Sequence, residues 1–236
     1  MITIHFVSYN EEVRLQFMLD HYKSRFPTCH FVVYDNFSTD ETINIALRNN
    51  CEIIPYNTDN THNDELLRNL KNNCWKNAKT DWVLVCDPDE LFDVNEDDLK
   101  FEESVGTTII RATGYNMVNM SEDPCDCELN NIKYGMRSLP HDKMFIFNKK
   151  HIKEINFNHG SHVASPVGNI KFNSKQYNMY HYHFINTEFV YNRYQMTMNR
   201  FSEINKKHGW GIHCSLSLED LNKKINNIRI NAIKIR

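Results

Sequence analysis

Short apolar runs alternate with amphipathic stretches over about the first 95 residues of the chain. Four runs have the length of buried strands, and they lie at residues 2–8, 30–34, 52–56 and 82–86. Between them, apolar side chains recur at helical spacing in residues 10–26, from residue 38 onward, and in residues 63–79. Three strand–helix units that close on a fourth strand predict a parallel sheet built from right-handed βαβ units.

After residue 95 the pattern changes, because strand-like segments follow one another with few helices between them. They lie at residues 107–120, 143–157, 168–172 and 177–184, and helical spacing returns at residues 187–208 and 216–235. We therefore predict an α/β protein with one domain over residues 1–236. Its parts are a parallel half (1–95), a β-rich mixed or antiparallel half (96–190) and C-terminal helices (191–236).

The fourth apolar run, Trp82–Cys86, ends abruptly in Asp87-Pro88-Asp89-Glu90. In open α/β sheets, ligands bind at the carboxyl ends of the strands. Two hard carboxylates, held close together by the stiff Pro88, suit Mg²⁺ or Mn²⁺. The alternative interpretation is an ordinary acidic loop at a strand end. The position of the acids favours a metal site, with Asp87 and Asp89 as ligands.

A second acidic segment, Asp35-Asn36-Phe37-Ser38-Thr39-Asp40-Glu41-Thr42, follows the second apolar run. Ser38 followed by Glu41 predicts a capping box that starts a helix, and acids are favourable at a helix N-terminus. Capping does not account for Asp35, which precedes the cap. Its carboxylate could accept a hydrogen bond from the imide N–H of a base such as uracil.

Composition narrows the classes of function. The 236 residues are 41% apolar, which is enough for a proper core, and the net charge of -3 gives no field that would recruit nucleic acid. The chain begins without a signal-peptide pattern, and no apolar run approaches the roughly 20 residues of a membrane helix. We expect a soluble, cytoplasmic protein without a transmembrane segment.

The cysteine and glycine content argues against a disulfide framework, a zinc site and a glycine-rich phosphate-binding loop. Seven irregularly spaced cysteines argue against a disulfide framework, and Cys125-Asp126-Cys127 lacks the second pair that a zinc site needs. Only seven glycines occur, without a G-x-G-x-x-G motif or a P-loop. Phosphates would therefore need a binding device other than a glycine cradle, such as a metal ion.

The motifs in the first half resemble those of family 2-type glycosyltransferases with the GT-A fold. The resemblance rests on Ser8-Tyr9-Asn10-Glu11, on the segment from Tyr34 to Thr42, and on Lys71-Asn72, Ala78 and Asp87-Pro88-Asp89-Glu90. Lys71 stands where the family usually has arginine. Asp87 to Phe92 is similar to the D-x-D-E-F subgroup, and His181-Tyr182 with Thr187-Glu188-Phe189 is similar to its later H-Y block. The likeness is specific up to about residue 95 and looser to about residue 189.

The resemblance implies a GT-A (Rossmann-like) mixed sheet, with a nucleotide-sugar-binding half at 1–95 and an acceptor half at 96–190. It implies metal-dependent transfer of a sugar, commonly with inversion, from a nucleotide-sugar donor to an acceptor hydroxyl. A UDP-sugar is favoured, and the acceptor is an unknown glycan, protein or lipid. The implied cofactor is Mn²⁺ or Mg²⁺, held by Asp87 and Asp89. The implied donor-binding residues are Ser8, Asn10, Glu11, Asp35, Lys71 and Asp87.

Two histidines are candidates for completing the metal shell. His181 and His183 are two apart in a strand pattern, so they share one face of the sheet. The alternative is that both simply pack on a half-buried sheet, since aromatic residues fill the opposite face. A neutral imidazole can bind a metal or hydrogen-bond a diphosphate. His181 is favoured because it carries the resemblance, and His183 is the alternative.

An inverting transfer needs a base near the acceptor hydroxyl. Asp142, which precedes the strand-like segment 143–147, is the candidate, and its alternative interpretation is a solvated turn residue. Glu154, His159 and His162 are rivals for the same role.

Two other functions remain open at this point. A Mg²⁺-dependent nucleotidyltransferase could use a similar sheet, but it would need a glycine-rich basic loop where this chain has Ser8-Tyr9-Asn10-Glu11-Glu12. An inactive carbohydrate-binding relative is the third hypothesis, and the intact D-x-D motif counts against it.

Overall fold

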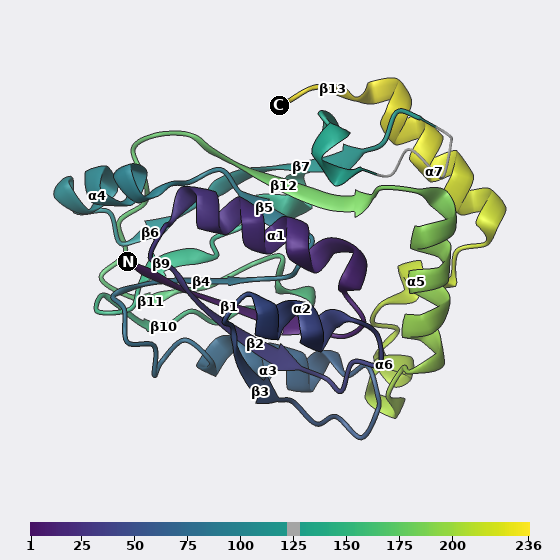
Figure 1. The fold of residues 1–236 in the computed structure, drawn as a ribbon, viewed down its shortest axis with the longest axis horizontal. Helices are drawn as coiled ribbons and strands as arrows, with labels where there is room; N and C mark the ends of the chain where they lie inside the picture. Colours follow the sequence, from purple (N-terminus) through teal and green to yellow (C-terminus); the bar gives the residue numbers. More distant parts are fainter. Residues whose placement is uncertain (122–127) are drawn as a thin grey trace.

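The computed structural model drawn in Figure 1 describes residues 1–121 and 128–236. Four strands, ordered β3-β2-β1-β4, are all parallel: β1 (Ile2–Ser8), β2 (His30–Asp35), β3 (Glu52–Pro55) and β4 (Trp82–Cys86). The helices between them are α1 (Glu12–Arg25), α2 (Thr42–Arg48) and α3 (Asp64–Asn73). The three predicted strand–helix units and the parallel half are confirmed. The Cys125-Asp126-Cys127 motif lies outside the described residues.

The parallel sheet continues as a mixed sheet. β9 (Ile146–Asn148) lies antiparallel to β4, and β6 (Ile109–Ile110) lies antiparallel to β9. A second sheet has the order β13-β8-β7-β12-β5, with strands β5 (Glu90–Phe92), β7 (Ala112–Val118), β8 (Tyr134–Arg137), β12 (Tyr177–Phe184) and β13 (Ile233–Lys234). A short antiparallel pair joins β10 (Ile152–Glu154) and β11 (Val167–Gly168). The predicted mixed α/β architecture, with a parallel half and a β-rich second half, is confirmed.

The remaining helices include three that stand together along one side of the molecule, beside the end of β12 (Figure 1). These are α5 (Thr187–Asn199), α6 (Glu203–His208) and α7 (Leu218–Asn231), whereas α4 (Glu96–Ser104) lies at the opposite end. The described ranges also contain the short 3-10 helices η1 (Leu129–Asn131), η2 (Leu139–His141), η3 (His159–Ser161) and η4 (Ile212–Ser215). None of the helices in the described ranges combines the length and apolar character needed to cross a bilayer.

The capping box predicted at Ser38 is wrong. The Ser38 hydroxyl donates to Asp35 Oδ1 at 2.6 Å, and the Ser38 N–H donates to Asp35 Oδ2 at 3.0 Å. Helix α2 begins later, at Thr42, whose N–H donates to Asp40 Oδ1 at 3.0 Å. Asp35 therefore closes a turn after β2, because a carboxylate can accept both donors of the serine at once.

Helix boundaries in the C-terminal region also differ from the prediction. The expected helix over 187–208 is broken into α5 and α6, because the Ser202 side chain accepts from the N–H of Asn205 and starts a new helix. The expected helix over 216–235 ends at Asn231. The chain then forms β13, whose Ile233 pairs with Gly135 of β8, so the C-terminus returns to the second sheet.

Strand β4 is buried along its whole length, between β1 on one side and β9 on the other. The acids that follow it do not form a loop alone, because Glu90 begins the buried strand β5. β5 pairs antiparallel with β12, and this places His181 opposite Glu90. The sequence pattern did not reveal this short strand, although its pairing positions the site described below.

Glu102 of α4 anchors the segment that leads into β12. Its buried carboxylate accepts hydrogen bonds from Tyr177 Oη at 3.0 Å, from the Ser174 N–H at 3.2 Å and from the Thr107 hydroxyl. Burial favours the protonated acid, but these donors outweigh it and lower the pKa of Glu102.

We expect Glu102→Gln to lower the free energy of unfolding by about 1–3 kcal/mol at neutral pH, because buried donors lose a charged acceptor. The folded pKa of Glu102 lies below its ordinary value of 4.5, so the wild-type advantage is complete above that value. It is lost as the pH falls through the folded pKa. Urea unfolding at a series of pH values measures this loss, and the exposed Glu103→Gln is the control. A stability difference that does not change with pH would contradict the assignment.

Candidate metal and nucleotide site

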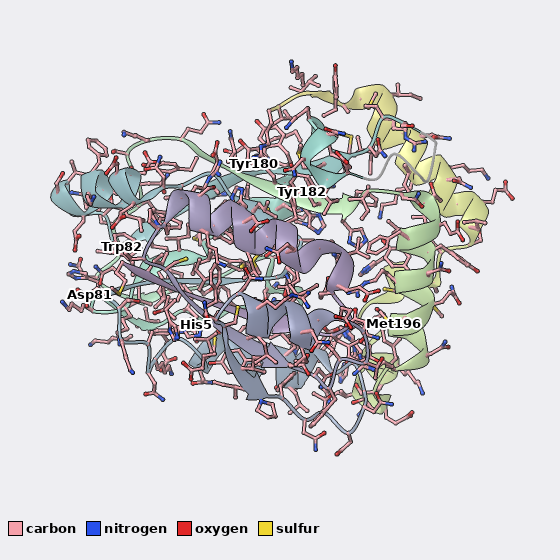
Figure 2. The ribbon with its side chains drawn as sticks, viewed as in Figure 1. His5, Asp81, Trp82, Tyr180, Tyr182 and Met196 are labelled. Atoms are coloured by element: carbon pink, nitrogen blue, oxygen red, sulfur yellow. The ribbon has the colours of Figure 1, made fainter. Side chains whose placement is uncertain are left out.

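A cavity of about 720 Å³ opens where β1 and β4 end, with α5 and α7 contributing to its wall. Its lining includes Tyr9 after β1, Asp87 and Asp89 after β4, and Met196 of α5. Figure 2 shows Met196 on the side of α5 that faces the strands, whereas Asp81 and Trp82 lie at the other end of the molecule. The cavity therefore occupies the carboxyl edge of the parallel strands, where the acidic motif was expected to act.

Asp89, His181 and His183 form the group that could hold a metal ion among residues 1–121 and 128–236. One ligand atom from each side chain lies within 4.8 Å of the others. Asp89 Oδ2 is 3.5 Å from His181 Nε2 and 3.4 Å from His183 Nδ1. The antiparallel pairing of β5 with β12 brings these residues together across more than 90 positions of sequence. The structure thus places both predicted histidines, rather than one of them, beside Asp89.

Each imidazole is oriented by a partner on its far nitrogen. His181 Nδ1 lies 2.9 Å from Asn116 Oδ1 on β7, and His183 Nε2 lies 3.2 Å from Tyr194 Oη on α5. The two rings are stacked with their centroids 5.2 Å apart. A hydrogen bond at one ring nitrogen fixes the tautomer, so the lone pair of the other nitrogen can point to a metal.

Arg14 of α1 completes the surroundings of Asp89, although no motif in the sequence marks it as a site residue. Its Nη1 donates to Asp89 Oδ2 at 2.8 Å. Burial favours protonation of Asp89, but the charge of Arg14 holds the pKa of Asp89 well below its usual range. Burial lowers the pKa of His183 to about 4. At neutral pH the carboxylate is charged and the His183 imidazole is neutral, which are the states that bind metals.

Asp87 lies in the cavity wall but outside the metal-binding group. Both of its carboxylate oxygens accept from Lys71 Nζ, at 2.7 and 2.8 Å. Burial favours the neutral acid, but the buried Lys71 ammonium lowers the pKa of Asp87. The spacing between Lys71 and Asp87 that carried the resemblance therefore corresponds to a direct ion pair.

Glu11 also lines the cavity, where it joins two arginines from different helices. Its Oε2 accepts from Arg14 Nη2 at 2.7 Å, and its Oε1 accepts from Arg193 Nη2 of α5. Arg193 Nη1 also donates to the carbonyl oxygen of Tyr9 at 3.1 Å. Glu11 thus fastens α5 to the loop after β1 and fixes the guanidinium that holds Asp89.

The predicted base-binding residue, Asp35, is buried outside the cavity lining, with both oxygens engaged by Ser38. The adjacent Asn36 lines the cavity instead, and its Nδ2 donates to Thr58 Oγ1 at 2.9 Å. Arg200 donates to Asn36 Oδ1, and its guanidinium carbon lies 3.3 Å from the centre of the Tyr9 ring.

Two further predicted donor-binding residues occupy different surroundings. Ser8 is buried and lines the cavity, and its hydroxyl has no hydrogen-bond partner within the described ranges. Asn10 lies outside the lining, where its Oδ1 accepts from the Thr39 N–H at 2.7 Å. The Ser8 hydroxyl thus has unused hydrogen-bonding capacity at a buried position, whereas Asn10 supports the loop after β1.

The candidates for the catalytic base differ in whether their side chains line the cavity. Asp142 is outside the cavity lining, where Oδ1 accepts from the Gly114 N–H at 2.9 Å and Oδ2 from Arg137 Nη2 at 2.6 Å. Glu154 is exposed and pairs with Lys76 at 2.8 Å. His159 and His162 both line the cavity.

Comparison with known proteins agrees with the motifs. Residues 3–100 match the family model described as Glycosyl transferase family 2. The predicted resemblance to family 2 glycosyltransferases is thus confirmed over these residues. No curated protein matches the chain significantly.

The solved structures that match this chain are similar to it only at low sequence identity and low TM-score. TarS from S. aureus is 16% identical with a TM-score of 0.48, covering 86% of this chain and 44% of its own. Glucosyl-3-phosphoglycerate synthase from Mycobacterium tuberculosis, solved with Mn²⁺ and UDP, is 17% identical with a TM-score of 0.32, covering 48% and 44%. The mannosyltransferase PcManGT from Pyrobaculum calidifontis is 18% identical with a TM-score of 0.35, covering 53% and 36%. This chain spans less than half of each, and such likeness assigns it neither a substrate nor residue roles.

Proposed function

We propose that the protein is a metal-dependent glycosyltransferase that moves a sugar from a nucleoside diphosphate sugar to an acceptor hydroxyl. The observation that carries the proposal is the group Asp89, His181 and His183 in the cavity of a family 2 domain. One carboxylate and two oriented imidazoles converge there at the carboxyl edge of the parallel strands. Such a site can hold a divalent cation beside a diphosphate.

The donor set fits a divalent transition metal, and it favours Mn²⁺ over Mg²⁺. Imidazole nitrogen suits transition metals, whereas Mg²⁺ prefers a shell made almost entirely of oxygen atoms. When bound, the cation would neutralise negative charge on the departing diphosphate. We therefore assign the metal to Asp89, His181 and His183, with Asp87 left to its ion pair with Lys71.

The protein's own groups prepare this site before any ligand arrives. Arg14 keeps Asp89 ionised and oriented, and Asn116 and Tyr194 set the two rings. Lys71 holds Asp87 at the cavity wall, where its carboxylate can meet the donor's ribose. Such preorganisation lowers the cost of assembling a charged site.

At the nucleoside end we propose that Asn36 and Tyr9 face the base. Asn36 lines the cavity and Asp35 does not, and the Tyr9 ring offers a surface for stacking once Arg200 moves aside. A uracil base remains favoured by the resemblance. The side-chain N–H groups of Asn36 already donate to the Tyr56 carbonyl and to Thr58, so its amide oxygen is the atom that would accept from the imide N–H of the base once Arg200 moves aside.

We further propose that transfer inverts the anomeric centre and that Asp142 is not the base. Its carboxylate is committed to Arg137 and to the backbone of Gly114. His159 and His162 are the candidates that line the cavity. Asp142 instead fixes the turn between β8 and β9.

We expect UDP with Mn²⁺ to raise the unfolding temperature more than UDP alone, and more than GDP with Mn²⁺. The physical reason is that a ligand bound only by the folded state stabilises it by RT ln(1 + [L]/Kd), or about 2.7 kcal/mol at a hundred times Kd. A thermal-shift panel with Mg²⁺ and EDTA arms measures this. A shift that is insensitive to divalent cations would contradict the metal site. Pyrophosphate release from a nucleoside triphosphate would instead favour a nucleotidyltransferase.

A further inference from the structure

Six cationic side chains line the cavity within the described ranges, and four of them contact carboxylates. Those four are Arg14, Lys71, Lys143 and Arg193. The other two, Arg200 and Lys224, come from the C-terminal region and form no ion pair with an acid of residues 1–121 or 128–236. The cavity therefore carries positive charge on its C-terminal wall that the described residues leave unbalanced.

Arg200 and Lys224, the two cations without an acidic partner among the described residues, differ in how many of their N–H groups already form hydrogen bonds. Arg200 donates to Asn36 Oδ1 and to the carbonyl oxygen of Asn60, and it covers the Tyr9 ring. Lys224 has one described contact, with its Nζ lying 5.3 Å from the centre of the Phe184 ring. A lysine ammonium has three N–H donors, so Lys224 retains donors for a ligand in the cavity.

Lys224 packs over a residue next to the metal-binding group. Phe184 directly follows His183, and the two rings meet edge to face with centroids 5.0 Å apart. Helix α7 is fixed because Leu221 and Ile225 on the same helix are buried in the core. The side chain of Lys224 therefore reaches the cavity from a fixed helix, at an exposed position over the Phe184 ring.

We propose that Lys224 binds a phosphate oxygen of the donor's diphosphate, so that α7 completes the nucleotide-sugar site. This inference rests on the proposed function. A diphosphate carries more negative charge than one divalent cation neutralises, and ammonium–phosphate hydrogen bonds are charge-assisted. Four of the five carboxylates that line the cavity within the described ranges pair with another lysine or arginine, and the fifth, Asp64, contacts His62 and Asn205 rather than Lys224. No described acid of the cavity wall therefore pairs with Lys224.

The adjacent lysine provides a matched control. Lys223 lies on the same helix, but its Nζ contacts Glu219 Oε1 at 2.7 Å and does not line the cavity. Lys223→Ala and Lys224→Ala remove the same side chain one position apart. Both residues are exposed, so each substitution is expected to leave the unfolding temperature nearly unchanged.

The experiment is calorimetric titration of UDP, GDP and uridine, each with and without Mn²⁺. We expect Lys224→Ala to weaken UDP binding about tenfold and to leave uridine binding unchanged, because a charge-assisted hydrogen bond to phosphate is lost. Lys224→Arg is expected to retain most of the affinity, and Lys223→Ala all of it. Equal UDP affinities for Lys224→Ala and Lys223→Ala would overturn the inference while leaving the proposed function intact. Failure of the wild type to bind UDP or GDP would overturn both.

Discussion

Asp89→Asn is expected to reduce Mn²⁺ affinity and sugar transfer by at least about a hundredfold while the protein stays folded. The substitution keeps the size of the side chain but removes the charge that faces His181 and His183. Changing even an outer partner of a metal ligand costs 10–100-fold in affinity or activity, so loss of a charged ligand should cost at least as much. Arg14 keeps its ion pair with Glu11, so its guanidinium is not left without an acid.

Isothermal titration with Mn²⁺ and steady-state transfer assays measure the two losses, and circular dichroism checks the fold. Asp81→Asn is the matched control, because Asp81 lies just before the opposite end of β4 and pairs with exposed Lys150 at 2.6 Å. It should behave like the wild type. Wild-type Mn²⁺ affinity in Asp89→Asn would show that the metal binds elsewhere or not at all.

Lys143→Met is expected to lower the free energy of unfolding by about 3–5 kcal/mol, the usual cost of removing one partner from a buried ion pair. Lys143 and Glu90 are both about 2% exposed at the side chain and form a direct ion pair. Burial raises the pKa of Glu90, and the Lys143 ammonium opposes that effect. Without Lys143 the Glu90 carboxyl must become protonated or remain charged away from water.

Urea unfolding at neutral pH measures this loss. The double variant Glu90→Gln/Lys143→Met should recover most of the stability, because it leaves no buried charge without a partner. Equal stabilities for the single and double variants would show that Lys143 contributes through packing, for example against the Phe145 ring at 4.7 Å.

Periodicity and local chemistry predicted much of the N-terminal half. The apolar run at Trp82–Cys86 predicted a doubly buried strand, and the acids after it predicted a site at the carboxyl edge. The spacing of His181 and His183 predicted that they share a face of β12. These features depend on neighbours in sequence, where side-chain alternation and strand length are decided.

Other site features depend on contacts that no local pattern encodes. Arg14 reaches Asp89 across 75 positions, and Arg193 reaches Glu11 across 182. Neither arginine stands in a motif, and each looks like an ordinary charged residue on an amphipathic helix. Asp35 precedes the predicted cap, so the sequence favours it as the base-binding residue, yet both of its carboxylate oxygens accept from Ser38 in the turn after β2.

The sequence by itself determined the strand–helix alternation, the family 2 character of residues 3–100 and the acids available for a metal. Only the tertiary structure decided which acid meets the histidines, because that depends on the pairing of β5 with β12. The three residues of β5 are too few to give a strand signal of their own, and long-range pairing supplies the energy that fixes them. That pairing brings the Asp89 carboxylate beside two imidazoles, whereas the Asp87 carboxylate pairs with Lys71.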